Sequence, residues 1–304
     1  MNREFHNQPL VSIIMNCYNG ELFLKQAIDS VITQTYSNWE IIFWDNQSTD
    51  KSAKFFKSYS DSRLKYYCAP KHTKILYKAK NDALKKINGE FIAFLDVDDW
   101  WLPDKLDEQI PLFENQSVGL VYGNFWYFFE KEKKKKIFKK TKLPTGKILG
   151  EMLGENLIGS PTYIIRKKSL HSLDYCFDDN FHIIGDYDLQ TRLSIKWNFE
   201  CVQKPIAYAR RHGKNESLLN RDLEIKEMKI WHDQFKNNPN FLSYKAFYNI
   251  PKNILYLETM DSILKEKFSK SFLKVMKYPL SIKKIKLIIA LFLPKVYLIK
   301  IKNY

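Results

Sequence analysis

Cysteine and glycine are scarce in this 304-residue chain, and each scarcity argues against a class of site. The four cysteines, Cys17, Cys68, Cys176 and Cys201, are far apart and include no C-x-x-C pair. We therefore expect reduced thiols in a cytosolic protein and neither a zinc site nor a disulfide framework. The glycine patterns G-x-G-x-x-G and G-x-x-x-x-G-K-[ST] are also missing. Any bound phosphate would have to be held by side chains or a metal ion.

Long apolar runs are missing as well. The amino terminus has no apolar stretch leading to a small-residue cleavage site, so no signal peptide is expected. The run Leu10–Met15 is too short to span a bilayer and fits a first strand. Near the carboxyl end, Ile285–Ile301 is interrupted by lysines and a proline. Its uninterrupted part, Leu287–Leu293, is far shorter than the ~20 residues of a spanning helix. The sequence therefore predicts a cytoplasmic protein without a spanning segment.

The net charge of +15 is concentrated in two segments. Residues 262–304 hold eleven lysines and one acidic residue, and Lys131–Lys142 holds eight lysines and one acidic residue. The remainder of the chain is close to neutral. Because nucleic-acid-binding proteins more often spread basic residues over the folded core, we expect no nucleic-acid partner. We interpret Lys131–Lys142 as a hairpin tip or a mobile, solvated loop.

The basic residues of the tail alternate with apolar ones. A basic amphipathic segment can lie in an anionic membrane surface, and we predict this contact for residues 262–304. The protein would then be peripheral at the inner face of the cell membrane. The alternative is a C-terminal helix that packs on its own domain. Three amphipathic helices are expected at Arg221–Phe235, Tyr244–Thr259 and Asp261–Lys277.

Strands and helices alternate in the first third of the chain. The expected strands are Leu10–Asn16, Trp39–Trp44, Leu64–Cys68 and Phe91–Leu95, and the expected helices are Glu21–Thr33, Ala53–Tyr59 and Lys74–Ile87. This order favours a parallel sheet covered by helices. Further on we expect helices at Asp104–Phe113 and Asp186–Trp197, and strands at Val118–Phe129, Gly159–Arg166 and Pro205–Arg211. We predict an α/β domain over residues 1–220 and a helical, basic region over 221–304.

Acidic residues follow two of the expected strands. Asp45 follows Trp39–Trp44, and Asp96 and Asp98 follow Phe91–Leu95. Carboxyl ends of parallel strands are where open sheets bind their ligands. Asp96 and Asp98 are two residues apart, so both point to one side of an extended backbone. Two converging carboxylates repel each other unless a cation such as Mg²⁺ or Mn²⁺ lies between them. Taken alone, so short a pattern fits a solvated acidic turn better than a metal site, and we interpret Asp99 as a turn residue.

Two longer segments carry a family resemblance. VSIIMNCYNGELFLKQAIDSVITQTYSNWEIIFWDNQSTDKS, with FIAFLDVDDWWLPDKL further on, resembles glycosyltransferase family 2. The resemblance covers roughly residues 9–215 and is far more specific than a lone D-x-D. It implies a GT-A fold, with a mostly parallel sheet flanked by helices. The helices expected after residue 220 would add a helical C-terminal extension to that fold. The resemblance also implies inverting transfer from a nucleotide-sugar donor with Mg²⁺ or Mn²⁺ as cofactor.

The resemblance assigns donor-binding roles to four residues around the first strands. Tyr18 and Glu21 fall in the family's first nucleotide-binding loop, and Asp45 matches the aspartate that contacts the base. Lys80 stands where members often have arginine, near the diphosphate. The family usually has a second acidic residue after that aspartate, and this chain has Asn46 instead.

A metal and diphosphate site is implied by the second segment and by a late histidine. Asp96 and Asp98 match the family's metal-binding D-x-D, with Asp98 as the more direct ligand and Asp96 also near the donor. His212, in ARRHGKNES, resembles a histidine that approaches the metal and the diphosphate. Arg211 could assist there.

The segment GDYDLQTRL, Gly185–Leu193, resembles the family's E-D-x-D-L-x-x-R-L and makes Asp186 the candidate catalytic base. The family's preceding Glu is Gly185 here. Asp188 and Arg192 have the i,i+4 spacing of a structural ion pair. Contacts with the acceptor are expected from Trp100, Trp101, Ser160 and Tyr163, with a core or rim position as the alternative for the two tryptophans.

These residues predict a metal-dependent inverting glycosyltransferase. The simplest donor is a UDP-sugar, and the expected acceptor is a glycan or a lipid-linked intermediate of surface polysaccharide biosynthesis. One alternative is a nucleotidyltransferase that forms sugar nucleotides, but NCYNGE offers only one glycine and no basic residue for its phosphate loop. Another is a non-enzymatic basic protein that binds nucleic acid or acidic lipid, which tight, salt-sensitive DNA binding without donor hydrolysis would support.

Overall fold

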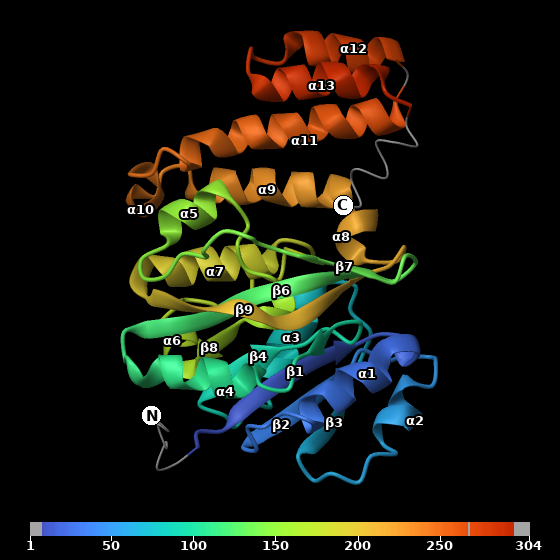
Figure 1. The fold of residues 1–304 in the computed structure, drawn as a ribbon, viewed down its shortest axis with the longest axis vertical. Coiled ribbons are helices and arrows are strands. Elements are labelled where there is room, and N and C mark those ends of the chain that lie inside the picture. The colour runs from blue at the N-terminus through green and yellow to red at the C-terminus, as the bar shows by residue number, and fades with distance from the viewer. Residues whose placement is uncertain (1–7, 267, 295–304) are drawn as a thin grey trace. The chain divides into compact units, whose positions relative to one another are not determined.

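The protein consists of two compact units, Met1–Leu219 and Asn220–Tyr304. A computed structural model describes residues 8–266 and 268–294. The first unit is a sheet flanked by helices, and the second unit is helical (Figure 1). The last ten residues of the tail for which we predict membrane contact, 295–304, lie outside the described residues.

The first unit contains one sheet, with nine strands among the described residues. The strands are β1 (Val11–Cys17), β2 (Trp39–Asp45), β3 (Leu64–Cys68), β4 (Phe91–Phe94), β5 (Trp100–Trp101), β6 (Val118–Phe129), β7 (Lys134–Ile137), β8 (Ile164–Arg166) and β9 (Asn198–Arg211). Their spatial order is β3-β2-β1-β4-β8-β6-β9-β5, and β7 pairs with β6.

The sheet is parallel in one half and mixed in the other. Strands β3, β2, β1 and β4 pair in parallel, which confirms the prediction from the alternating pattern. Strand β8 runs antiparallel to both β4 and β6. Strand β9 runs parallel to β6 and antiparallel to the short β5. The carboxyl ends of β1, β2 and β4 therefore lie along one edge.

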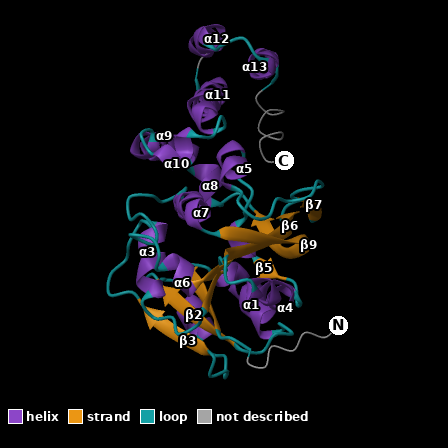
Figure 2. Cartoon of the chain, turned by 90° about the vertical axis from the view of Figure 1, so that its left-hand side faces the viewer, coloured by secondary structure: helices purple, strands orange, loops and turns teal. Residues whose placement is uncertain are grey.

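Two apolar layers cover the sheet, one on each face. The helices of the first unit are α1 (Glu21–Ile32), α2 (Ser52–Phe56), α3 (Leu76–Leu84), α4 (Lys105–Gln109), α5 (Leu149–Gly154), α6 (Lys167–Leu170), α7 (Gly185–Lys196) and α8 (Glu216–Leu219). Neighbouring residues of β1 point to opposite faces, so Ile13 packs with α1 and α4, whereas Ile14 packs with α3 and α7. Figure 2 shows α1 and α4 on one side of the sheet and α3 on the other.

Two of the expected strands have different bounds in the structure, and each contains a proline. The expected strand Gly159–Arg166 begins with a 3₁₀ turn, Ser160–Thr162, and only Ile164–Arg166 pairs in the sheet. Strand β9 starts at Asn198, well before the expected start at Pro205. Its pairing with β6 shifts register next to Pro205, and this irregularity accommodates a residue that has no N–H to donate.

The lysine-rich segment forms a hairpin, as one of the two interpretations predicted. Strand β7 pairs antiparallel with the end of β6. The Lys135 ammonium lies 4.6 Å from the ring centre of Trp126 and 5.8 Å from that of Tyr208. These cation–π contacts fix the strand against its neighbours, so this part of the segment is structured and not a loose loop.

The second unit has helices α9 (Arg221–Phe235), α10 (Pro239–Leu242), α11 (Ile250–Lys265), α12 (Phe268–Lys277) and α13 (Ile282–Phe292). The prediction that one helix ends at Thr259 and the next begins at Asp261 is wrong, because α11 continues to Lys265. Asp261 and Lys265 form an i,i+4 ion pair at 2.9 Å that supports the last turn of α11. Within the described residues, none of the helices has the length and apolar character needed to cross a bilayer.

Candidate functional site

The predicted site residues of the first strands meet at the carboxyl edge of the sheet. Cys17 at the end of β1 lies opposite Asp45 at the end of β2. Ile14 lies opposite Phe94, so the chain beyond β4, which carries Asp96 and Asp98, leaves the sheet at the same edge. The first residues of α7 reach this edge too, because the Tyr163 hydroxyl contacts Asp186 there.

Asp186 lies in a cluster built from four separate segments. It stands in the first turn of α7, and the Tyr163 hydroxyl donates to its Oδ1 at 2.6 Å. Lys80 Nζ, from α3, lies 3.7 Å from Asp186 Oδ1 and 3.8 Å from Asp96 Oδ1. The Ser160 hydroxyl donates to Asp96 Oδ2 at 3.1 Å. The structure therefore brings together the candidate base, Asp96 and two residues predicted to contact the acceptor.

Charge in this cluster is balanced by Lys80, whose side chain is 2% exposed. Burial alone would lower the pKa of Lys80, but the carboxylates of Asp186 and Asp96 outweigh it and raise that pKa. Burial, together with the charge of Asp186, holds the pKa of Tyr163 well above its ordinary value, so its hydroxyl stays a donor. Desolvation raises the pKa of Asp96, which the charge of Lys80 opposes. Lys80 is thus a cation held between two carboxylates.

A second cluster lies around Asp98. His212 Nε2 lies 2.9 Å from Asp98 Oδ2, and the Asn215 amide donates to the same oxygen at 3.3 Å. Asn215 Oδ1 accepts the backbone N–H of His212 at 2.6 Å and so fixes the turn after β9. The structure brings Asp98 and His212 into contact, whereas Asp96 turns toward Lys80 and Ser160. A metal ion between Asp98 and His212 stays a prediction.

The donor set around Asp98 fits a cation that a substrate also coordinates. Among residues 8–266 and 268–294, no group of three or more His, Cys, Asp and Glu side chains converges to hold a metal ion. Asp98 and His212 supply two ligand atoms. Mg²⁺ commonly takes one or two protein carboxylates and completes its shell with substrate phosphates and water. The Asp98 carboxylate suits this role, and the His212 imidazole would add a nitrogen ligand, which transition-metal ions accept more readily than Mg²⁺ does.

Asp99 and Arg210 connect the loop after β4 to the end of β9. Asp99 Oδ1 accepts the Arg210 backbone N–H at 2.8 Å, and Arg210 Nε donates to the Asp98 carbonyl at 2.8 Å. Burial and the charge of Asp98 raise the pKa of Asp99 well above its ordinary value. Asp99 is therefore a buried turn residue, as interpreted from the sequence. Arg211 points elsewhere, with its guanidinium 4.5 Å from the ring centre of Tyr127.

The predicted nucleotide-binding residues hold two loops together. Asp45 is buried, and its carboxylate accepts the Tyr66 hydroxyl at 2.6 Å and the Ser48 N–H at 2.7 Å. The Glu21 carboxylate accepts the Lys51 N–H at 2.8 Å. These hydrogen bonds order the loops beside the carboxyl edge of the sheet. Contact of the Asp45 and Glu21 carboxylates with a nucleotide stays a prediction.

Tyr18 is exposed beside these loops, and its ring centre lies 4.4 Å from that of His72. His72 Nδ1 in turn lies 3.0 Å from the Asn46 carbonyl oxygen. Tyr18 is therefore open to a flat ligand at the same edge, with His72 as a neighbour that the sequence did not single out.

The two tryptophans after Asp99 have different environments. Trp101 is 2% exposed and packs in the core with residues of α1 and α4, so it takes the core position left open as the alternative. Trp100 is half-buried, and its ring stacks on Tyr208 at 4.6 Å with 9° between the planes. Tyr163 is fully buried and contacts Asp186, so the predicted acceptor contact does not fit it. Acceptor contact at this edge thus remains a prediction for Trp100 and Ser160.

Sequence reasoning missed four residues that touch the site. They are Tyr66, His72, Tyr77 and Asn215. Tyr66 and Tyr77 read as core residues of a strand and a helix, and His72 and Asn215 stand in loops without a recognisable pattern. Tyr77 explains the missing family glutamate, because a Cβ added at Gly185 would lie 2.4 Å from the Tyr77 ring. A side chain at position 185 would collide with it.

The amino-acid sequence of the chain is similar to a family model and to named relatives. The family model described as "Glycosyl transferase family 2" matches residues 12–173. Escherichia coli WfgD, a UDP-Glc:alpha-D-GlcNAc-diphosphoundecaprenol beta-1,3-glucosyltransferase, is 42% identical over 116 residues, which cover 38% of this chain and 46% of WfgD. E. coli WfaP, named for the same activity, is 39% identical over 127 residues, 40% of this chain and 48% of WfaP. The chain spans about half the length of these relatives.

Solved structures share the fold over most of the chain. Staphylococcus aureus TarS 1–349 has a TM-score of 0.67 at 17% identity, covering 88% of this chain and 81% of TarS 1–349. The mannosyltransferase PcManGT of Pyrobaculum calidifontis, solved with GDP-Man and Mn²⁺, has a TM-score of 0.66 at 14% identity, covering 98% of this chain and 88% of PcManGT. At these identities the likeness shows the GT-A fold and nothing about substrates.

Proposed function

The chain belongs to glycosyl transferase family 2, and from this premise we propose that it is an inverting, metal-dependent glycosyltransferase. The observation that carries the proposal is the position of Asp186. Its carboxylate stands at the start of α7, held by Tyr163 and Lys80, on the same sheet edge as the Asp98–His212 pair. In this proposal the Asp186 carboxylate serves proton transfer, and the separate Asp98 carboxylate serves the diphosphate.

In the proposed reaction, an acceptor hydroxyl attacks the anomeric carbon of the donor from the side opposite the leaving nucleoside diphosphate. Asp186 takes the hydroxyl proton as general base. Tyr163 keeps the carboxylate oriented, and Lys80 lets Asp96 and Asp186 stay close together despite their like charges. A single displacement inverts the anomeric configuration and requires no covalent intermediate on the protein.

Asp98 and His212 would hold Mg²⁺ or Mn²⁺, whose charge would stabilise the departing diphosphate. Asp45, Tyr18 and Glu21 would bind the nucleoside side of the donor in this proposal. Asp96 would face the sugar and not the cation, because it is turned toward Lys80 and Ser160. Arg211 would need to leave the Tyr127 ring to reach the diphosphate.

We infer a UDP-sugar as donor and a lipid-linked glycan as acceptor. The names of WfgD and WfaP, which give UDP-Glc as donor and a diphosphoundecaprenol-linked sugar as acceptor, support both inferences. Bacillus subtilis TuaG, named as a putative teichuronic acid biosynthesis glycosyltransferase and 31% identical over 120 residues, supports a role in surface polysaccharide assembly. The enzyme would then work in the cytoplasm, peripheral at the inner face of the cell membrane, with residues 262–304 toward the anionic surface.

The test is a panel of UDP-, GDP- and dTDP-sugars with Mg²⁺ or Mn²⁺, scored by release of nucleoside diphosphate. We expect turnover of at least one UDP-sugar, lost when EDTA removes the cation. Asp186→Asn should lower kcat by about 10²–10⁴-fold, because proton transfer is lost, while binding of UDP changes little.

Asp174→Asn is the matched control, since Asp174 is an exposed aspartate outside the site and its substitution makes the same chemical change. This variant should turn over donor at the wild-type rate. The proposal is wrong if no sugar nucleotide is turned over or bound, or if Asp98→Ala is as active as the wild type.

A further inference from the structure

Helix α13 has two apolar faces, and its own unit buries only one of them. Leu287, Ala290 and Leu291 pack into the core of the second unit with Val275 of α12. The other face is formed by Ile282, Ile285, Ile289 and Phe292, which we call the apolar stripe. These four side chains are between 55% and 75% exposed. Their spacing of three, four and three residues places them in one line along the helix.

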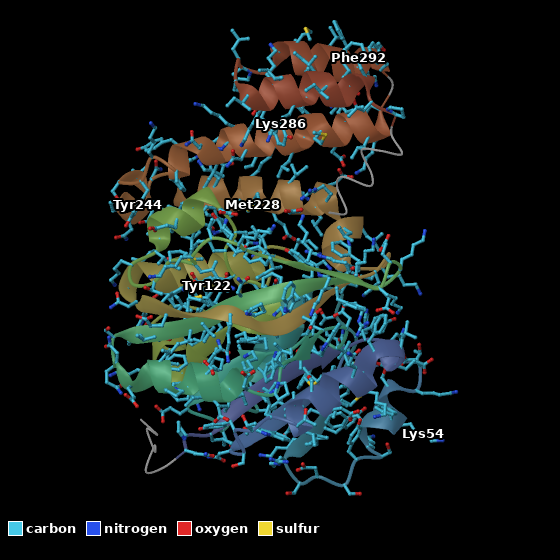
Figure 3. All side chains as sticks on the ribbon, viewed as in Figure 1. Lys54, Tyr122, Met228, Tyr244, Lys286 and Phe292 are labelled. Carbon is cyan, nitrogen blue, oxygen red and sulfur yellow. The ribbon has the colours of Figure 1, made fainter. Side chains whose placement is uncertain are left out.

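The apolar surface continues onto α12. The rings of Phe268 and Phe292 lie 5.8 Å apart, and α12 and α13 lie side by side in both views of the chain (Figures 1 and 2). Phe272, Leu273 and Met276 on α12 are exposed as well. Figure 3 labels Phe292 at the end of α13. A contiguous apolar surface of this kind is typical of sites that bind another molecule or a membrane.

The charges around this surface identify the partner. Lys283, Lys284 and Lys286 interleave with the apolar stripe along α13, and Lys270, Lys274 and Lys277 occupy a neighbouring side of α12. Residues 262–304 contain one acidic residue, Glu266, and its carboxylate already pairs with Lys274 at 3.0 Å. The surface therefore combines apolar side chains with an excess of positive charge.

This combination distinguishes a lipid surface from a second copy of the chain. Lysine is depleted from protein–protein interfaces, and two copies would bring like charges together. At a membrane the lysine stems can extend so that the ammonium groups reach the phosphates while the apolar side chains insert. Amphipathic helices with Lys on one side and Phe or Leu on the other lie in the interface plane of anionic bilayers.

We propose that α12 and α13 lie in the plane of an anionic bilayer surface and insert the apolar stripe between the lipids. The inference rests on the proposed function, because a lipid-linked acceptor places the reaction at a membrane. It goes further in naming which face of the second unit contacts the lipid.

The experiment uses the full chain and sedimentation with vesicles of mixed phosphatidylglycerol and phosphatidylcholine, and with vesicles of phosphatidylcholine alone. The wild type should bind the mixed vesicles, and added salt should weaken that binding. Ile285→Ser/Ile289→Ser should reduce the binding at least about tenfold, because two inserted side chains become polar. Since both residues are exposed, thermal unfolding should be unchanged.

Ile230→Ser/Leu255→Ser is the control, because these exposed residues belong to α9 and α11 and lie outside the apolar stripe. This variant should bind vesicles like the wild type. Equal binding by the stripe variant and the wild type overturns the proposal. The proposal is also overturned if the wild type does not bind vesicles but forms a dimer in analytical ultracentrifugation, and the stripe variant is monomeric.

Release of nucleoside diphosphate in solution separates this proposal from the proposed function. The stripe variant should keep the wild-type rate without vesicles, since its substitutions lie in the second unit and the reacting residues in the first. If the chain binds vesicles through the apolar stripe but turns over no donor, the proposed glycosyltransferase activity is wrong and the proposed membrane contact is still supported.

Discussion

Asp186 receives one hydrogen bond from a tyrosine that is itself fully buried, and this makes Tyr163 a positioning residue in the proposed mechanism. Replacing Tyr163 by Phe removes the donor and keeps the ring. Hydrogen bonds to charged groups contribute about 1.5–3 kcal/mol, which corresponds to a fall in kcat of about 10–100-fold if the bond orients the base. KM for the donor should change little. Steady-state kinetics at saturating acceptor would measure both.

Tyr122 provides the control for this substitution. It is equally buried, on β6 (Figure 3), and its hydroxyl donates to the Pro144 carbonyl at 2.6 Å, away from the carboxylates. Tyr122→Phe should lower the free energy of unfolding by about 1 kcal/mol and leave kcat unchanged. Equal losses of kcat in both variants would show that Tyr163 acts only on stability.

Lys105 is a buried lysine without a carboxylate partner among the described residues. Its Nζ donates to Gln109 Oε1 at 2.7 Å and lies 4.0 Å from the Trp101 ring centre. Burial holds the pKa of Lys105 well below its ordinary value. Between the folded and unfolded pKa values the unfolded chain binds a proton that the folded chain does not. The contribution of Lys105 therefore becomes less unfavourable as the pH rises.

The expected outcome concerns the variant Lys105→Met. The free energy of unfolding of this variant, minus that of the wild type, should increase as the pH is lowered from 9 toward 7. The increase should be up to about 1.4 kcal/mol for each pH unit. Urea denaturation at the two pH values would measure the difference. Lys54→Met, on an exposed residue of α2, should show no such trend (Figure 3). A pH-independent difference for Lys105→Met would contradict the assignment.

The residues of the site were predictable to different degrees. Asp186, Asp98 and His212 were predicted as site residues from short patterns, and the structure puts the last two in contact. Lys80 was expected near the diphosphate, yet it points between Asp96 and Asp186. The pattern places the α-carbon of a lysine, whereas the direction of its long side chain depends on the charges that surround it in the fold.

At the scale of elements, the packing of α3 against the start of α7 sets the position of the base. Gly185 begins α7, and an added Cβ would lie 2.4 Å from the Tyr77 ring. Gly185→Ala should therefore cost about 1–3 kcal/mol of stability and displace Asp186, so that activity falls as well. Gly213→Ala, whose Cβ would meet nothing within 4 Å, should leave stability unchanged.

A double-mutant cycle gives the sharper measurement. Tyr77→Ala alone opens a cavity, and adding Gly185→Ala to it should cost almost nothing, because the colliding ring is gone. The coupling free energy from urea denaturation should then lie near the full cost of Gly185→Ala in the wild type. Additive costs in the cycle would mean that the two residues do not collide.

Element boundaries were predicted well where local pattern and tertiary pairing agree. Helix α1 and strands β1 to β4 fall close to the expected ranges. Strand β9 was shortened in the prediction because Pro205 reads as a strand start, although a register shift on β6 accommodates it. The end of α11 was misplaced because an ion pair between Asp261 and Lys265 extends the helix past the point where the apolar pattern weakens.

At the scale of the whole molecule, the sequence indicates the layers of the first unit but not its strand order. Alternation of apolar strands and helices is a local property, so the parallel half of the sheet follows from it. The insertion of β8 between β4 and β6 depends on contacts between distant segments. The contact between Asp98 and His212 joins residues 114 apart in sequence. It could be predicted only from the family resemblance.

The uneven charge of the molecule leads to a last prediction, about the approach of the donor. The lysines of β7 and its turn are exposed. The hairpin begins beside the site, because the Glu130 N–H donates to the carbonyl of Arg211 at 2.9 Å, and Arg211 precedes His212. A nucleotide sugar is an anion, and a basic rim near a binding edge raises the rate of encounter when salt is low.

Lys134→Ser/Lys136→Ser should therefore lower kcat/KM for the donor about two- to fivefold at low ionic strength and leave kcat unchanged. The difference should vanish as salt shortens the screening length to about 8 Å or less. Lys86→Ser/Lys168→Ser removes the same charge from exposed positions before β4 and after β8, away from the carboxyl edge, and should have a smaller effect. If both double variants lose kcat/KM equally, net charge rather than the hairpin governs the encounter.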